Sequence, residues 1–597
     1  MSEPVEIHSP PISEARAGNA RGPGEPSRGE AIGLWVVLGV LAASFLFGLN
    51  AREPWNNAEA RVLIVAQGML DSGDWLRPTL FGHPRHNKPP LMYWATLGVA
   101  ALQGGLRETG AYWISALSAV ASILALAAAV WRIAGARAGA MAGIMLALSP
   151  GVLEYGREAQ LDSLFSACST ISLLAFALWI FRIGRWPAAW IPLAGAALGL
   201  GVLAKGPHAL TFAFGPPLVY LALRRRLDWK AGATLLGALL IGLAAPGAWL
   251  ALTEWRNPGY LAGVWRIIGK EAGGTNLEPF WYYIDKAVGW TLPWLLLVPA
   301  LWPRKAERAE KTAADELARF FATGFLLGFV ILSALPGKQR HYILPLMPSA
   351  MGWIALRLEA RLRQGEGLWG WRQRWVAWAG LALAAGAAIG FPSAYWVASV
   401  RSGFRAAAGP FLLILAPSAA GLAVAVAAFR RRSLAGALSG GALAWTSYVV
   451  FYVTAVCPAK NIEESPRVAC REMLRIAPNF SELMFYSKLR ELTAYWLGGL
   501  RPEAKTDSQA REFMSRPQPS YMLFSGSPGE VADDSHVLDG LGCRTIRQFR
   551  PFTGCNREAL LFANEAGARR AGLAPQGAAA RSGSDGASGQ AASAQGL

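Results

Sequence analysis

The sequence has little charge for its length. Of 597 residues only 16% are Asp, Glu, Lys or Arg, whereas 53% are hydrophobic and 25 are tryptophan. Soluble domains usually carry about a quarter of their residues as charged side chains, so this composition excludes that class and indicates a membrane protein. Cysteine is also scarce: there are five, with no C-x-x-C spacing, which argues against a cysteine metal centre. Cys543 and Cys555 are the expected disulfide pair, because they lie close together in the sequence.

Acidic residues are fewer than basic ones, 39 against 57, which leaves a net charge of +18. The basic residues form short clusters between apolar runs, such as RRR at 224–226 and at 430–432. Clusters of this kind are typical of the loops that stay on the cytoplasmic side of a membrane. We therefore expect the positive charge to set topology and expect no nucleic-acid partner.

Apolar segments long enough to span a bilayer, which takes roughly 17 to 25 residues, recur along the chain. The segment at 88–103 is not counted, because if it spanned, every later loop would change sides and the Lys and Arg excess would fall outside. We expect it to be an interfacial helix anchored by Tyr93 and Trp94. The thirteen expected spans are 31–49, 111–131, 137–153, 161–181, 187–204, 207–223, 231–252, 286–302, 318–335, 341–356, 375–397, 408–429 and 434–456.

The expected fold class is an all-α polytopic membrane protein with a small soluble α/β domain after the last span. The runs ELMFYS and SYMLFSG predict strands in that domain. The expected regions are a disordered cytoplasmic tail at 1–30, a membrane domain at 31–456 with outer loops at 50–110 and 253–285, a periplasmic α/β domain at 457–564, and a disordered tail at 565–597.

This topology places two acidic residues, Glu59 and Asp162, on the outer side of the membrane. A carboxylate in a water-accessible cavity can act as a general base toward an acceptor hydroxyl or amine, or can hold a divalent cation beside a phosphate. A structural alternative is that Glu59 pairs with Arg61 or caps a helix and that Asp162 is an N-cap. The spacing leaves both interpretations open, and it leaves a divalent metal as an open cofactor prediction.

Five further polar residues fall on the same side: Lys88, Lys205, Lys338, Arg340 and His341. Lys and Arg side chains are well suited to phosphate oxygens, so this set predicts an anion-binding site. For any single cation the alternative is that its side chain extends to the membrane surface without a ligand. The outer loops are therefore the predicted functional face.

Several motifs resemble one family. EAR, AQGMLDSGDWLRPTLFGHPRHNKPPLMYW, LDSLF, AKGP and KQRHYILPLMP are similar to the bacterial branch of the dolichyl-phosphate-mannose protein mannosyltransferases, which includes the aminoarabinose transferase of lipid A. The resemblance covers roughly residues 31–350. It implies a GT-C fold and an inverting transfer of a sugar from a polyprenyl-phosphate donor to a lipid, glycan or protein acceptor. The expected protein is a monomer in the inner membrane, with its N-terminus inside and its C-terminal domain outside.

The resemblance also suggests roles for individual residues. Lys88, held at the start of a helix by Pro89 and Pro90, would meet the donor phosphate while Glu59 approaches from the preceding helix. The expected supporting residues are Arg61, Arg157 and Tyr342.

Two positions depart from the family pattern. Relatives often carry Asp where this chain has Ala58 and an acidic residue where it has Asn87, so Glu59 would act alone or with Asp162. The departures keep a catalytically silent, lipid-binding relative open as an alternative. A transporter or flippase of lipid-linked sugars is another, and it predicts matching internal halves with broken helices.

Overall fold

The computed structural model describes residues 27–272, 278–292, 294–301, 312–335, 337–363, 371–401, 408–431, 433–486, 489–554 and 557–573. The chain divides into two compact units. Unit 1 comprises Met1–Glu53 and Arg61–Ala459, and unit 2 comprises Pro54–Ala60 and Lys460–Leu597. Most of the tails expected at 1–30 and 565–597 falls outside the described residues.

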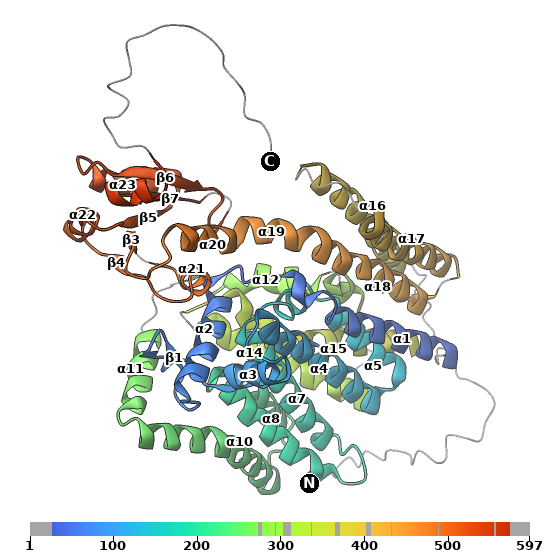
Figure 1. Cartoon of the computed structure of the whole chain (residues 1–597). Coiled ribbons are helices and arrows are strands. Elements are labelled where there is room, and N and C mark those ends of the chain that lie inside the picture. Colours follow the sequence, from blue (N-terminus) through green and yellow to red (C-terminus); the bar gives the residue numbers. More distant parts are fainter. Residues whose placement is uncertain are drawn as a thin grey trace. The chain divides into compact units, whose positions relative to one another are not determined.

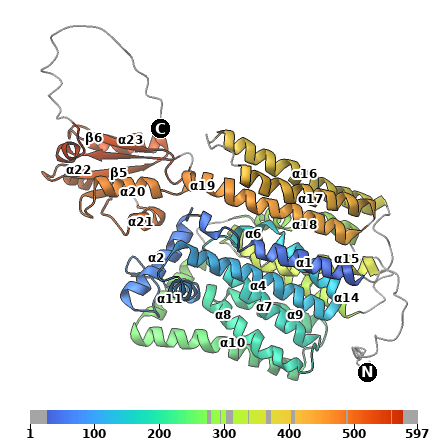
Figure 2. The same ribbon diagram turned by 45° about the vertical axis from the view of Figure 1, so that its right-hand side comes forward.

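Unit 1 is almost entirely helical (Figures 1 and 2). A two-stranded hairpin of β1 (Thr79–Leu80) and β2 (His83–Pro84) interrupts it near the start. The remaining elements up to Ala459 are α1 (Arg28–Ser44), η2 (Leu49–Ala51), α2 (Asn57–Ser72, whose first turn belongs to unit 2), α3 (Leu91–Leu102), α4 (Glu108–Ala134), α5 (Ala136–Ala147), α6 (Pro150–Tyr155), α7 (Leu161–Ile180), η3 (Pro187–Ala189), α8 (Trp190–Lys205), η4 (Leu210–Phe214), α9 (Gly215–Leu223), α10 (Trp229–Arg256), α11 (Tyr260–Ala272), α12 (Tyr282–Thr291), η5 (Trp294–Leu297), α13 (Val298–Leu301), α14 (Ala313–Ala334), η7 (Arg340–Leu346), α15 (Met347–Arg363), α16 (Trp371–Arg401), α17 (Ala408–Arg430), α18 (Leu434–Phe451), η8 (Tyr452–Val456) and the start of α19 (Cys457–Glu464).

Within the described ranges, eight helices are long and apolar enough to cross a membrane, judged by length and composition. Three shorter apolar helices, Leu91–Leu102, Ala136–Ala147 and Leu210–Leu223, fall below that length. The eight candidate spans are Arg28–Ala51, Glu108–Ala134, Leu161–Ile180, Pro187–Lys205, Trp229–Arg256, Ala313–Ala334, Gly409–Arg430 and Ser439–Glu464.

Several of the expected spans are not continuous α-helices, and proline accompanies two of these interruptions. The segment expected at 137–153 forms α5, which ends at Ala147, and α6, which starts at Pro150. Proline lacks the N–H that would continue α5, and it suits the first position of a new helix. The segment expected at 341–356 begins instead as the 3-10 helix η7, which contains Pro345, before α15 starts at Met347.

Close helix packing surrounds the centre of unit 1. Helix α7 lies beside both α4 and α8, and α8 also packs against α10. Gly199 of α8 faces Gly242 of α10, where a Cβ atom on Gly199 would collide with the backbone of Gly242. Small residues of this kind allow apolar helices to approach closely in a membrane.

The predicted helices at the start of unit 1 are present. Glu59 lies in the first turn of α2, the helix that precedes Lys88, as predicted. Helix α3 begins at Leu91 with Pro90 as its N-cap, so the double proline precedes the helix as predicted.

Unit 2 contains a five-stranded mixed sheet (Figure 1). The strand order is β4-β3-β5-β7-β6; β3 is parallel to β4 and β5, and β7 is antiparallel to β5 and β6. The two runs predicted as strands form β3 and β5. The strands are β3 (Leu483–Tyr486), β4 (Glu503–Ala504), β5 (Tyr521–Gly526), β6 (Arg544–Phe549) and β7 (Glu558–Ala563), and the helices are α20 (Arg467–Ile476), α21 (Glu491–Trp496), α22 (Asp507–Met514), α23 (Pro528–Ser535), η9 (His536–Leu538) and α24 (Glu565–Arg570).

Cys543 is a free cysteine. Its predicted disulfide partner, Cys555, lies outside the described residues.

Candidate functional site

An ion pair between Asp162 and Lys205 lies at the centre of the candidate site. Asp162 is in the first turn of α7, Lys205 is the last residue of α8, and the Lys205 ammonium group donates directly to Asp162 Oδ1. Asp162 is 5% exposed and Lys205 9% exposed. The N-cap of α7 is Gln160, so the alternative that Asp162 caps this helix is wrong. Two buried charges at neighbouring helix ends compensate each other here.

His341 and Tyr342, at the start of η7, complete the surroundings of this pair. His341 Nε2 lies 3.5 Å from Asp162 Oδ1. Lys205 Nζ lies 4.4 Å from the centre of the Tyr342 ring, a cation–π distance. The structure thus brings together Asp162, Lys205, His341 and the predicted supporting residue Tyr342.

Lys88 and Arg340 lie near the same group. Both of them, together with Lys205, act electrostatically on His341. The Arg340 guanidinium pairs with Glu154 of α6 and lies 6.0 Å from the centre of the Tyr155 ring. Arg340 remains half exposed, whereas Asp162 and Lys205 are buried. Lys88, Lys205 and Arg340 thus concentrate positive charge around His341, and the guanidinium of Arg340 is exposed.

Glu154 was missed by sequence reasoning. It lies in the run EYGRE between two predicted spans, and the spacing of that run gives no sign that its partner is Arg340. The one sequence feature that could have identified Glu154 as a candidate is its position in a predicted outer loop, on the predicted functional face.

Lys338 has a different environment. Its Nζ donates to the backbone oxygen of Glu278 at 2.8 Å, and the residue is 6% exposed. The backbone N–H of Gln339 donates to the Tyr283 hydroxyl at 3.2 Å. These bonds hold the segment that leads into η7, so Lys338 contributes to positioning His341.

Glu59 belongs to unit 2, whereas the other predicted site residues belong to unit 1. The Trp55 N–H donates to Glu59 Oε2 at 2.9 Å, and the Glu59 N–H donates to Asn56 Oδ1 at 3.0 Å. Glu59 is fully buried and makes the contacts of a helix cap. Arg61, the first residue of α2 within unit 1, acts electrostatically on Tyr93.

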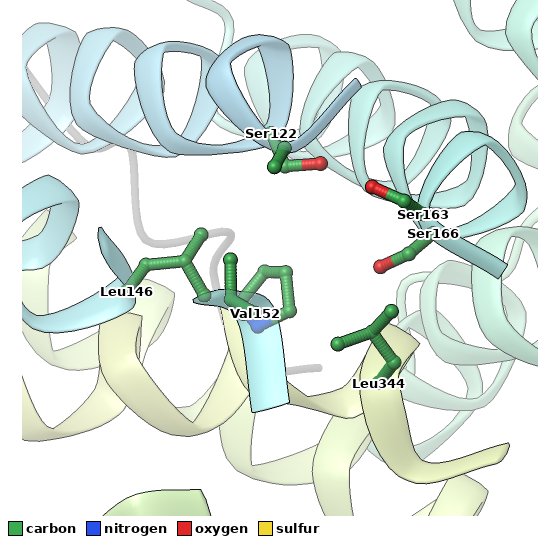
Figure 3. Close-up of a pocket in the computed structure, with 8 residues that line it drawn as sticks. Ser122, Leu146, Val152, Ser163, Ser166 and Leu344 are labelled. Carbon is green, nitrogen blue, oxygen red and sulfur yellow. The ribbon is translucent and has the colours of Figure 1, made fainter. Parts of the chain in front are cut away.

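A small pocket lies next to the first turns of α7 (Figure 3). Ser163 and Ser166 of α7 and Ser122 of α4 line one side, with Leu146, Val152 and Leu344 facing them. Neither Asp162 nor Lys205 is among the residues that line this pocket. It offers hydroxyl groups on one wall and apolar side chains on the other.

The residues do not fit the predicted metal site. Over the described part of the chain, there is no group of three His, Cys, Asp or Glu side chains that could hold a metal ion. The Asp162 carboxylate is already bonded to Lys205, and Glu59 accepts a backbone hydrogen bond.

Arg157, predicted as a supporting residue, binds the end of the first membrane helix. Its guanidinium donates to the backbone oxygens of Phe45 at 3.2 Å and Phe47 at 2.7 Å, and it lies over the Tyr452 ring at 5.4 Å. Backbone carbonyls at a helix end have no partner within the helix, so a side-chain donor satisfies them. Arg157 is 3% exposed, so these bonds are buried. Its contacts indicate a structural role.

Arg157→Leu is therefore expected to destabilise unit 1 by about 1.5 to 3 kcal/mol, the usual loss for charge-assisted hydrogen bonds. Thermal unfolding of the purified protein in detergent would measure the effect. The exposed Arg256 at the end of α10 provides a matched control as Arg256→Leu, with little expected change. Equal melting temperatures for the two variants would contradict the role.

Comparisons with known proteins find similar glycosyltransferases. The sequence pattern of the dolichyl-phosphate-mannose-protein mannosyltransferases matches residues 87–250. The chain is 29% identical over 346 residues to the undecaprenyl phosphate-alpha-4-amino-4-deoxy-L-arabinose arabinosyl transferase 1 of Pseudomonas fluorescens, covering 54% of this chain and 57% of the relative. A transferase of the same description from Edwardsiella ictaluri is 27% identical over 333 residues, 52% of this chain and 57% of the relative. The chain thus matches less than two thirds of these relatives' own length.

Solved structures show the fold. The crystal structure of ArnT from Cupriavidus metallidurans in the apo state superposes with a TM-score of 0.67 at 20% identity, covering 91% of this chain and 99% of ArnT. The structure of the same protein bound to undecaprenyl phosphate gives the same values. The predicted resemblance is confirmed: the chain has the fold of ArnT, it is similar in sequence to undecaprenyl phosphate-aminoarabinose transferases, and it matches the mannosyltransferase family pattern at residues 87–250.

Proposed function

We propose that this protein is a membrane glycosyltransferase that moves a sugar from a polyprenyl-phosphate donor to an acceptor. The observation that carries the proposal is the buried Asp162–Lys205 pair with His341 beside it and with Lys88 and Arg340 nearby. The relatives' names specify an undecaprenyl phosphate-linked aminoarabinose, so an undecaprenyl-phosphate sugar is the proposed donor class. The proposed acceptor is a lipid A-like lipid, with a glycan or a protein as further candidates.

The positive groups suit the leaving phosphate. Cleavage of the sugar–phosphate bond leaves negative charge on the phosphate, and cations already held in place stabilise that charge. Lys88, Lys205 and Arg340 are the proposed donors to its oxygens. A phosphate bound at Lys205 would compete with Asp162 for the ammonium group and would free the Asp162 carboxylate.

Inverting transfer also needs a base for the acceptor. In one displacement the acceptor oxygen or nitrogen attacks the anomeric carbon from the side opposite the phosphate and loses its proton. We propose Glu59 and Asp162 as the two carboxylates for this step. Glu59 is the acidic residue that remains beside Ala58, where relatives often have Asp.

The proposed arrangement follows the distribution of Lys and Arg in the loops. It has thirteen spans in the inner membrane, the N-terminus inside, and the helix of residues 91–102 at the outer surface. The proposed domains are a membrane domain at 31–456, an α/β domain at 457–564 on the periplasmic side, and tails at 1–30 and 565–597. The protein is proposed to act as a monomer.

Purified protein incubated with radiolabelled undecaprenyl-phosphate aminoarabinose and lipid A tests the function. Transfer of label to lipid A supports the proposal, and release of undecaprenyl phosphate should match it mole for mole. Binding of the donor with no transfer to lipid, glycan or peptide acceptors would instead identify a silent lipid-binding relative, the alternative that Ala58 and Asn87 favour. Movement of intact donor across a vesicle membrane would identify a flippase.

A further inference from the structure

Unit 2 contains a buried guanidinium group without a counter-charge. Arg501, in the loop between α21 and β4, is 3% exposed. Its Nε and Nη1 atoms are buried without a hydrogen-bond partner, and Nη2 makes a single long bond of 3.4 Å to the Leu497 backbone oxygen. Within the described residues, no acidic side chain forms an ion pair with it.

The neighbouring thiol does not supply the missing charge. Burial lowers the pKa of Arg501, and Cys470 of α20 is the group that opposes this effect electrostatically. Burial also raises the pKa of the Cys470 thiol, so the thiol stays neutral near pH 7. An uncompensated charge inside a protein is costly, and such a group is retained where something else compensates it.

One face of the guanidinium is covered by a ring that is itself exposed. Arg501 lies 3.6 Å from the centre of the Phe480 ring, and Phe480 is 53% exposed. Gly499, with φ of 145°, also lies close to the Phe480 ring: a Cβ atom at this position would lie 3.3 Å from it. The Phe480 ring therefore lies between one face of the guanidinium and solvent.

Unit 2 has a second arginine beside an aromatic ring. Arg467 of α20 lies 5.0 Å from the centre of the Trp496 ring at the end of α21, and α20 packs beside α21 (Figure 2). Guanidinium groups bind phosphate with strong charge-assisted bonds.

We propose that Arg501 is the anion-binding residue of a phosphate site in unit 2, and that Phe480 is its movable cover. This proposal does not depend on the proposed sugar transfer. The phosphate group could be free or could be the headgroup of a lipid.

Local hydrogen–deuterium exchange of the full-length protein in detergent tests the proposal. Inorganic phosphate is expected to slow exchange in residues 497–502 by about tenfold at saturation, because a ligand of the native state stabilises the site. A short-chain phosphatidate tests the lipid source, and acetate at equal ionic strength tests a carboxylate. Slowing by phosphatidate alone supports a lipid headgroup, and slowing by phosphate supports a free anion. Slowing by acetate alone, or by none of the three, would overturn the site.

Variants separate binding from folding. Arg501→Met removes a buried charge, so it should fold, and it should lose the phosphate effect. Phe480→Ala should bind phosphate more tightly, because it removes the cover. The matched control is Arg516→Met, since Arg516 is exposed and lies 4.9 Å from the Phe513 ring. The proposal fails if Arg501→Met keeps the effect or if Arg516→Met loses it.

Discussion

Lys205→Met is expected to reduce sugar transfer roughly hundredfold or more, the usual loss when one preorganised donor to a developing negative charge is removed. Lys205 is buried, pairs with Asp162 and lies under Tyr342, so its ammonium group is held in a single place before the donor binds. The measurement is the initial rate of label transfer at saturating donor.

The control for this prediction is a lysine with similar contacts elsewhere. Lys286 pairs with Asp285 at 2.8 Å and lies 4.0 Å from the centre of the Tyr282 ring, but Asp285 is largely exposed. Lys286→Met should retain most activity. Because Lys205→Met leaves Asp162 as an unpaired buried charge, the double variant with Asp162→Asn should recover stability without recovering activity. Full activity in the double variant would show that the pair serves folding alone.

Glu59→Gln is expected to lower transfer by about a hundredfold if Glu59 is the general base. Glutamine keeps a side-chain oxygen that can accept the Trp55 N–H, so the helix cap survives and the charge alone is lost. Thermal unfolding should therefore change little. Combined kinetic and melting measurements on one preparation would separate the two roles.

Glu254 provides the matched control for Glu59. Its carboxylate accepts the N–H groups of Gly259 and Leu261 at 2.8 Å and 2.7 Å, and it is not one of the proposed catalytic groups. Glu254→Gln should be nearly as active as the wild type. Near-normal turnover of Glu59→Gln would leave Glu59 as a cap and would make Asp162 the remaining carboxylate for the base.

Much of the site could be predicted from loop charge, but not its pairings. The excess of Lys and Arg in alternate loops predicted that Lys88, Asp162 and Lys205 share one side, and the structure brings them close together. That Asp162 pairs with Lys205 depends on how the ends of α7 and α8 meet, and no local pattern records such a contact. The same is true of Arg340 and Glu154, which are 186 residues apart.

Helix boundaries were harder to predict where proline interrupts an apolar run. Hydropathy treats 137–153 as one segment, yet Pro150 divides it into α5 and α6, and α6 carries Glu154 toward Arg340. In the same way η7 is a 3-10 helix, so its residues follow a different angular spacing from an α-helix. Apolar content therefore predicted where helices occur better than it predicted the side chains presented between them.

The short segment Pro54–Ala60 has a consequence for biosynthesis. Trp55 Nε1 donates to Asn461 Oδ1 at 2.8 Å, and the Leu492 N–H donates to Asn57 Oδ1 at 3.0 Å, across separations of 406 and 435 residues. A ribosome makes this segment near the beginning and its partners near the end of the chain. Contacts so distant in sequence form late. During most of translation the segment therefore lacks its contacts with Asn461 and Leu492. Glu59 thus reaches its final surroundings only when the chain is nearly finished, so a prematurely terminated product inserts its membrane helices without assembling the proposed base.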